Sequence, residues 1–182
     1  MIFFFLVLIA MLLAFVAQQF IGPIPNFGCR VFLMQIVMFY GAVALPSWGM
    51  LGVAFTGGMM WDLFHVQLVE NNEPEIGLGW SVVLYTVLCG FLAGFRPLFQ
   101  RGRWELHCLL TGICVSVIPL AEYLMLSIRR QPVVFVFDKA IWWRIGGAGL
   151  TAAFLAPFFF FGLNYLSYLV SYNPHSERPK QN

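Results

Sequence analysis

Asp62 and His65 are the two residues of an apolar stretch whose side chains could do chemistry. They lie three positions apart in the segment 57–66, which reads GGMMWDLFHV, and this spacing places both side chains on one face of a helix. A carboxylate beside an imidazole suits metal binding or proton transfer. A metal site needs three or four ligands, however, and no second acidic or histidine pair is near in the sequence. We therefore expect local hydrogen bonding at a helix end.

Asp62 is costly if its helix lies in lipid. A carboxylate at the centre of a membrane helix costs about 2.5–3.5 kcal/mol on insertion scales, so such residues face the bundle interior and take a partner. Candidate partners are Arg144, His65 and the backbone donors of a broken segment. An alternative is that the helix ends near Trp61 and leaves Asp62 at the interface. The apolar continuation from Leu63 to Val69 favours a longer helix.

Glu122 raises the same question in a later apolar segment. Pro119, three residues earlier, is expected to kink that helix and to free a backbone carbonyl. A kinked helix with a carboxylate suits the wall of a cavity. Glu122 equally suits packing against the Arg129–Arg130 end of the same helix, and the sequence leaves both interpretations open.

Motifs for enzymatic catalysis are missing from the sequence. It contains no H-E-x-x-H, G-x-S-x-G or Walker A pattern. The four cysteines form no C-x-x-C pair, which favours a role as small apolar fillers; they are Cys29, Cys89, Cys108 and Cys114. We expect a protein that is not an enzyme, with no cofactor and no metal site.

The composition is that of a membrane protein. Of 182 residues, 60% are hydrophobic and 10% charged, and the mean hydropathy is +0.82. A soluble domain is about 45–50% apolar and about 25% charged, so a bilayer is the natural solvent for this chain. The net charge of only +2 indicates no basic patch and hence no nucleic-acid partner.

Six apolar segments are separated by turn-forming or polar residues. They cover about Ile2–Phe20, Val31–Leu45, Met50–Leu68, Leu78–Phe95, Leu106–Leu126 and Ile141–Val170. The second is short, so either five or six helices span the membrane. The sequence predicts an all-α, polytopic membrane helical bundle of about six transmembrane helices. It forms one domain over residues 1–172, followed by a polar tail over residues 173–182.

The distribution of basic residues predicts the orientation. The loop Arg96–Arg103 carries three arginines, which places it in the cytoplasm. The acidic segment 70–75 then faces outward, and six spans put both chain ends in the cytoplasm. Arg129, Arg130 and Lys139 would lie outside, against the general bias.

Small residues cluster on several of the predicted helices. Gly57 and Gly58 lie in the third, Gly90 and Gly94 form a G-x-x-x-G in the fourth, and the sixth contains Gly-Gly-Ala-Gly at 146–149. Such faces let helix backbones approach closely in a bilayer. The contact is either within the chain or with a partner helix.

The order of these features resembles one family, the rod shape-determining protein MreD. The sequence begins with two apolar helices and a turn with proline. These are followed by a glycine-rich helix ending in G-x-x-x-D, a Leu-Gly pair and a further helix. The matching residues are Gly58 and Asp62, then Leu78 and Gly79, then the helix through Gly94. The distinctive part covers about residues 46–95.

The resemblance implies a fold similar to the six-helix substrate-binding subunits of energy-coupling-factor transporters. It implies a non-enzymatic, multi-pass protein of the cell inner membrane, within the elongation complex that directs lateral peptidoglycan synthesis and cell shape. The implied partners are an MreC-like bitopic protein and, through it, the elongation transpeptidase and glycosyltransferase and the MreB filament. Asp62 would either fix a helix corner or contact a partner.

Two other classes stay open: a small membrane enzyme, for which no motif is present, and a transporter subunit that binds a vitamin-like molecule. Ala10 and Ala14 form an A-x-x-x-A in the first apolar segment, as the docking helix of such subunits would need. Co-purification separates the scaffold from the transporter subunit, because a scaffold recovers a bitopic partner and a transporter subunit recovers a pair of ATPases.

The predicted topology can be tested by cysteine labelling. In a background without the native cysteines, single cysteines at Gln100 and Asn72 should react with a membrane-impermeant reagent from opposite sides, because their loops differ in charge. Labelling of both from the same side would contradict the topology.

Overall fold

The chain folds into helices joined by short connections. The structure is a computed structural model that describes residues 1–24, 28–65, 79–100, 103–129 and 138–170. Within these ranges the only β-type pairing is an isolated bridge between Ile24 and Cys29. The helices are α1 (Ile2–Phe20), α2 (Leu33–Ala44), α3 (Ser47–Phe64), α4 (Trp80–Gly94), α5 (Arg96–Gln100), α6 (Trp104–Arg129) and α7 (Lys139–Leu169).

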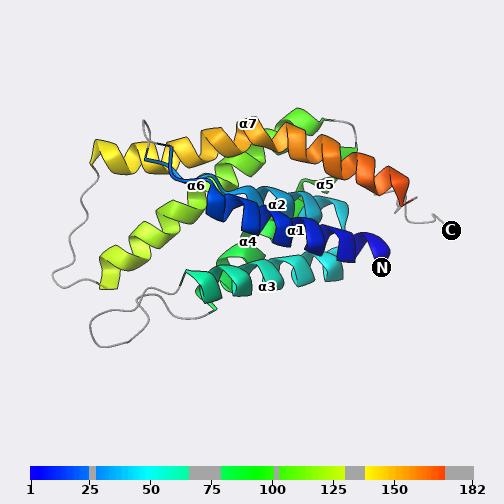
Figure 1. The fold of residues 1–182 in the computed structure, drawn as a ribbon, viewed down its shortest axis with the longest axis horizontal. Coiled ribbons are helices and arrows are strands. Elements are labelled where there is room, and N and C mark those ends of the chain that lie inside the picture. The colour runs from blue at the N-terminus through cyan, green and yellow to red at the C-terminus, as the bar shows by residue number, and fades with distance from the viewer. Residues whose placement is uncertain (25–27, 66–78, 101–102, 130–137, 171–182) are drawn as a thin grey trace.

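The long helices alternate in direction along one bundle axis. Figure 1 shows that α1 begins, and α7 ends, at the same end of the bundle. Helix α3 packs along α4, and α6 packs along α7. The chain therefore runs along the bundle axis an even number of times from the start of α1 to the end of α7.

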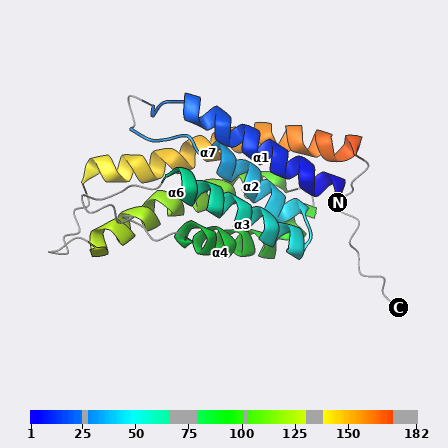
Figure 2. The same ribbon diagram turned by 60° about the horizontal axis from the view of Figure 1, so that its bottom comes forward.

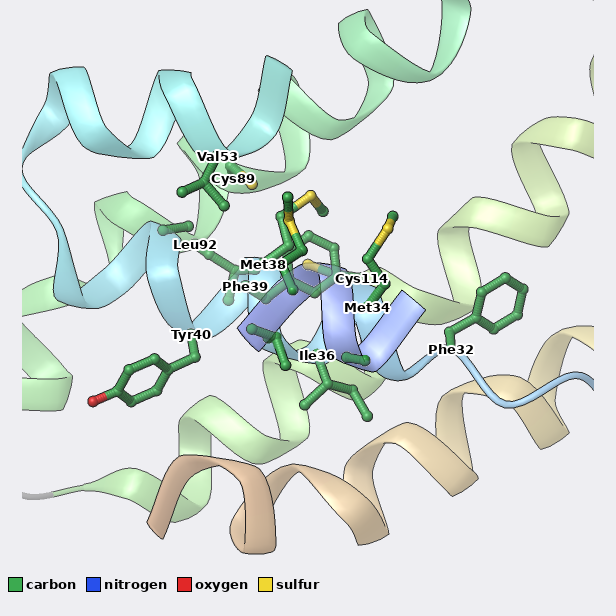
Figure 3. Close-up of a cluster of buried hydrophobic side chains, with 14 of the residues drawn as sticks. Phe32, Met34, Ile36, Met38, Phe39, Tyr40, Val53, Cys89, Leu92 and Cys114 are labelled. Carbon is green, nitrogen blue, oxygen red and sulfur yellow. The ribbon is translucent and has the colours of Figure 1, made fainter. Parts of the chain in front are cut away.

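Helix α2 forms the centre of the bundle. It contacts α1, α3, α4, α6 and α7, and every one of its twelve residues is buried. A helix that is apolar on all sides is stable only when it is surrounded. Figure 3 shows Met34, Met38 and Phe39 of α2 in the buried cluster that also contains Cys89 and Cys114.

The predicted helices are close to those observed, with two corrections. The first predicted segment matches α1 at both ends. The third was expected to reach Leu68, but α3 ends at Phe64. His65 leaves the helical conformation with φ −115° and ψ 21°, and its ring stacks on Trp61 with centroids 3.9 Å apart. The short helix α5 was not predicted, and it lies inside the arginine-rich loop.

Three described helices are long and apolar enough to cross a membrane: α1, residues Trp104–Ile128 of α6, and α7. Helices α2 and α4 have 12 and 15 residues, which gives lengths of about 18 and 22 Å against a hydrocarbon core of about 30 Å. Large apolar side chains cover the outside of the bundle, including Phe154 at 71% and Phe161 at 79% exposure. This surface suits lipid and not water.

Close helix contacts depend on particular glycines. A Cβ atom at Gly58 would lie 2.5 Å from the Val82 Cα atom, and one at Gly149 would lie 2.7 Å from the carbonyl oxygen of Gly112. Gly58 of α3 and Gly149 of α7 therefore pack inside the chain. Gly90 and Gly94 differ, because they are exposed on α4 and no atom lies within 4 Å of a Cβ built there.

The α6–α7 contact generates a test with a matched control on one helix. Gly149→Ala should lower the free energy of unfolding by about 1–3 kcal/mol, because the added methyl group meets the backbone of α6. Gly146→Ala, where a Cβ meets nothing within 4 Å, should be neutral or stabilising by about 0.5–1 kcal/mol. Thermal unfolding in detergent measures both, and equal effects of the two variants would contradict the packing.

Candidate functional site

Polar side chains gather at one end of the otherwise apolar bundle. This end, here called the polar end, is formed where α1 and α3 end and α4 and α7 begin, away from the start of α1 and the end of α7 (Figure 2). It contains the backbone amide of Gly79 and the side chains of Gln18, Arg30, Trp61, Asp62, His65, Glu122 and Arg144.

The Asp62 carboxylate closes the corner between α3 and α4. It is 9% exposed, and its Oδ2 atom accepts a hydrogen bond from the backbone N–H of Gly79 over 2.6 Å. Gly79 is the N-cap residue of α4 and has φ +94°, a conformation that glycine adopts without the strain of a Cβ. A carboxylate is favourable there because the N-terminus of a helix carries a partial positive charge. The donor is thus neither Arg144 nor His65; it is a backbone amide, but it belongs to the N-cap of the next helix and not to a broken segment.

Trp61 links α3 to α6. Its indole Nε1–H donates to Glu122 Oε1 over 3.1 Å, and the ring is 6% exposed. The His65 ring lies almost parallel to it at 15°, and the Phe32 ring is 5.6 Å away on centroids. Trp61 was not predicted from the sequence as a member of a site. The available signal was a tryptophan in an apolar segment, because a buried indole N–H needs an acceptor.

Glu122 lines a cavity, which is one of the two interpretations that the sequence left open. The cavity has a volume of about 30 Å³ and is also lined by Arg30, Phe32, Trp61, Pro119 and Arg144. Helix α6 runs without a break through Pro119. Arg144 faces this cavity and is not the hydrogen-bond partner of Asp62. Arg130 lies outside the described residues.

The other residues that were predicted as structural or partner-contact candidates do not lie together in the structure. Gly57 is buried against Met38, and Gly58 lies at the α3–α4 contact. Gly90 and Gly94 lie on the outer face of α4. Leu78 lies outside the described residues, as do the acidic segment 70–75 and the tail 173–182.

A second polar contact inside the bundle was also missed. Gln35 Nε2 donates to the Tyr85 hydroxyl over 2.9 Å, and both residues are fully buried. This bond joins α2 to α4.

Among the described residues, no three His, Cys, Asp or Glu side chains gather closely enough to hold a metal ion.

Burial lowers the pKa of His65 below its ordinary value. The positive charge of Arg30 lowers the pKa further, whereas the contact of the ring nitrogen with the Trp61 carbonyl oxygen raises it. The neutral imidazole is therefore favoured where the ring stacks on Trp61.

The comparisons with known proteins give no relative. A scan against protein-family models, a search of curated proteins and a search of solved structures each returned no match to this chain. The interpretation of the polar end therefore rests on its own geometry.

Asp62 substitutions test the corner. Asp62→Asn keeps an oxygen acceptor for the Gly79 N–H, whereas Asp62→Leu removes it, so Leu should cost about 1.5–3 kcal/mol of stability and Asn clearly less. Chemical or thermal unfolding in detergent gives the two values. Equal stability of both variants with the parent protein would show that the bond does not hold the corner.

The pKa of His65 predicts a pH effect. Because folding lowers this pKa, the unfolded chain takes up a proton more readily as the pH falls below about 6.5, and stability is lost in that range. The midpoint of thermal unfolding should therefore fall more between pH 7.5 and pH 5.5 in the parent than in His65→Phe, which keeps an aromatic ring on Trp61. Identical pH profiles for the two proteins would contradict this account.

Proposed function

We propose that the protein is a non-enzymatic scaffold of the inner membrane that belongs to the cell-elongation complex and holds together the proteins that direct lateral peptidoglycan synthesis. One observation carries the proposal. Gly58, Asp62 and Gly79, which carry the resemblance to MreD, meet in a single corner, where Gly58 lies against Val82 and Asp62 binds the Gly79 amide.

A stripe on the outer face of α4 is the proposed partner surface. Val83, Val87 and Phe91 are 59%, 63% and 50% exposed, and Gly90 and Gly94 lie open between and beyond them. This spacing puts all five on one side of the helix. A bare G-x-x-x-G in an apolar helix lets a second helix approach closely.

The single transmembrane helix of an MreC-like bitopic protein fits this stripe. Through that protein the scaffold would reach the elongation transpeptidase and glycosyltransferase and, indirectly, the MreB filament. The opposite face of α4 is already occupied, because Tyr85, Cys89 and Leu92 are buried in the core.

The proposal includes a multi-pass topology of about six helices with Arg96–Arg103 in the cytoplasm. The alternating directions of the helices support it (Figure 1). Arg96 Nε donates to the Val43 carbonyl oxygen over 2.9 Å, which ties the arginine-rich end to the end of α2. The short helices α2 and α4 cross together with their flanking residues.

One observation favours the second candidate, a transporter subunit that binds a small molecule. A cavity of about 150 Å³ opens at the polar end and is lined in part by Gln18, Trp61 and His65. The A-x-x-x-A that would dock such a subunit packs inside, since Ala14 is 6% exposed and Ala10 packs against the core. Recovery of an ATPase pair would support this candidate over the scaffold.

Bulky residues on the α4 stripe should separate partner binding from folding. Gly90→Leu and Gly94→Leu should each abolish recovery of the bitopic partner, because a helix cannot then approach the α4 backbone. Gly146→Leu is the control, since it adds the same bulk on another exposed site. Affinity purification from membranes measures recovery, and the amount of inserted protein should be equal for all three. Full recovery with both α4 variants would exclude this surface.

A further inference from the structure

We propose that the polar end binds the phosphate headgroup of an anionic membrane lipid, with one acyl chain of that lipid in an adjoining groove. This site is separate from the α4 stripe, and the proposal does not depend on the scaffold function.

Two arginines supply the charge that would hold the phosphate. Arg30 and Arg144 line the same small cavity although they come from the segment before α2 and from the second turn of α7. Among the described residues, neither guanidinium group has a hydrogen bond or an ion pair. Both side chains are exposed, and the positive charge of each acts on the nearby Glu122 carboxylate. A guanidinium group binds phosphate through two parallel hydrogen bonds.

The larger cavity provides room for the headgroup. It has a volume of about 150 Å³, and Arg30, Phe32 and Trp61 line both it and the small cavity. An engineered protein cavity of about this volume accepts a molecule the size of benzene. The Trp61 wall is held in place from two sides, by the bond to Glu122 and by the stacked His65 ring. The site is therefore preformed.

An apolar groove next to this cavity favours a lipid over free phosphate. The groove has an open volume of about 370 Å³, and Val31 lines both the groove and the headgroup cavity. Its other walls are Ile24, Leu150, Thr151, Phe154 and Leu155. Leu150 and Phe154 are 69% and 71% exposed. A charged cavity that continues into an apolar groove matches an amphiphile, whereas inorganic phosphate would use only the cavity.

The negative charge of Glu122 predicts in which direction the affinity should change when that charge is removed. The carboxylate lies in the same small cavity as the two arginines, so it opposes an anionic ligand. Removing that charge with Glu122→Gln keeps an acceptor for the Trp61 N–H and should tighten anion binding. A cationic or zwitterionic ligand held by Glu122 would instead bind more weakly to this variant.

The test uses the purified, delipidated full-length chain in a neutral detergent, with binding measured by isothermal titration calorimetry. The probes are dioctanoyl phosphatidate, dioctanoyl glycerol with the same chains but no phosphate, and inorganic phosphate. Phosphatidate should bind more tightly than either of the others. Arg30→Gln and Arg144→Gln should each weaken its binding about tenfold, the value of one lost charge-assisted contact.

Matched variants complete the design. Arg103→Gln removes an exposed arginine at the opposite end and should change the affinity less than about twofold, because the charge is distant. Leu150→Trp fills the groove and should weaken phosphatidate binding without changing phosphate binding. Circular dichroism and gel filtration establish that each variant is folded, and Glu122→Gln, with its expected gain of affinity, gives an answer even if an arginine variant unfolds.

Several results would overturn the proposal. Equal binding of phosphatidate and dioctanoyl glycerol would show that the phosphate is not recognised. An equal loss with Arg103→Gln would show binding by net charge alone. Phosphate binding as tight as phosphatidate binding would assign the cavity to a free anion and not to a lipid. Unchanged or weaker phosphatidate binding by Glu122→Gln would show that the two arginines do not bind an anion in this cavity.

Discussion

The hydrogen bond from the Gly79 amide to the Asp62 carboxylate is the constraint on which the arrangement of the bundle depends. It joins the last turn of α3 to the N-cap residue of α4 across 17 positions of sequence. Gly79 is the N-cap residue of α4, and its own backbone N–H has no acceptor within that helix, so the acceptor comes from α3. Asp62 is only 9% exposed, so little water replaces a lost partner, and a buried polar group left unpaired is costly.

The position of α4 determines two further contacts. With its N-cap residue held by Asp62, α4 lies so close to α3 that only glycine fits at position 58 against Val82. One turn further along, Tyr85 accepts a hydrogen bond from Gln35 of the central helix. The same orientation turns Gly90 and Gly94 outward. The corner at Asp62 thereby determines which face of α4 points out of the bundle.

The general architecture was predictable from the sequence, but the partners of the polar residues were not. Continuous apolar segments predict α1 and α7 well, because length and hydropathy are local properties. The need of Asp62 for a partner was also predictable from its insertion cost. Its actual partner was not, since a backbone amide at Gly79 carries no signal in the residue types. The end of α3 at Phe64 was not predictable either, because the apolar residues after Leu63 carry no stop signal. Small residues predict close packing, but only the structure separates Gly58, which is enclosed, from Gly90, which is open.

The exchange rate of the Gly79 amide proton tests the Asp62 corner most directly. Hydrogen–deuterium exchange in detergent, followed by NMR of protein labelled with ¹⁵N-glycine, resolves this one amide. The account predicts that it is protected in the parent protein and that Asp62→Leu raises its exchange rate at least about tenfold, which corresponds to a loss of about 1.4 kcal/mol. The amides in the middle of α4 should change much less. An amide that exchanges equally fast in the parent and in Asp62→Leu would contradict the central claim that this bond holds α3 and α4 together.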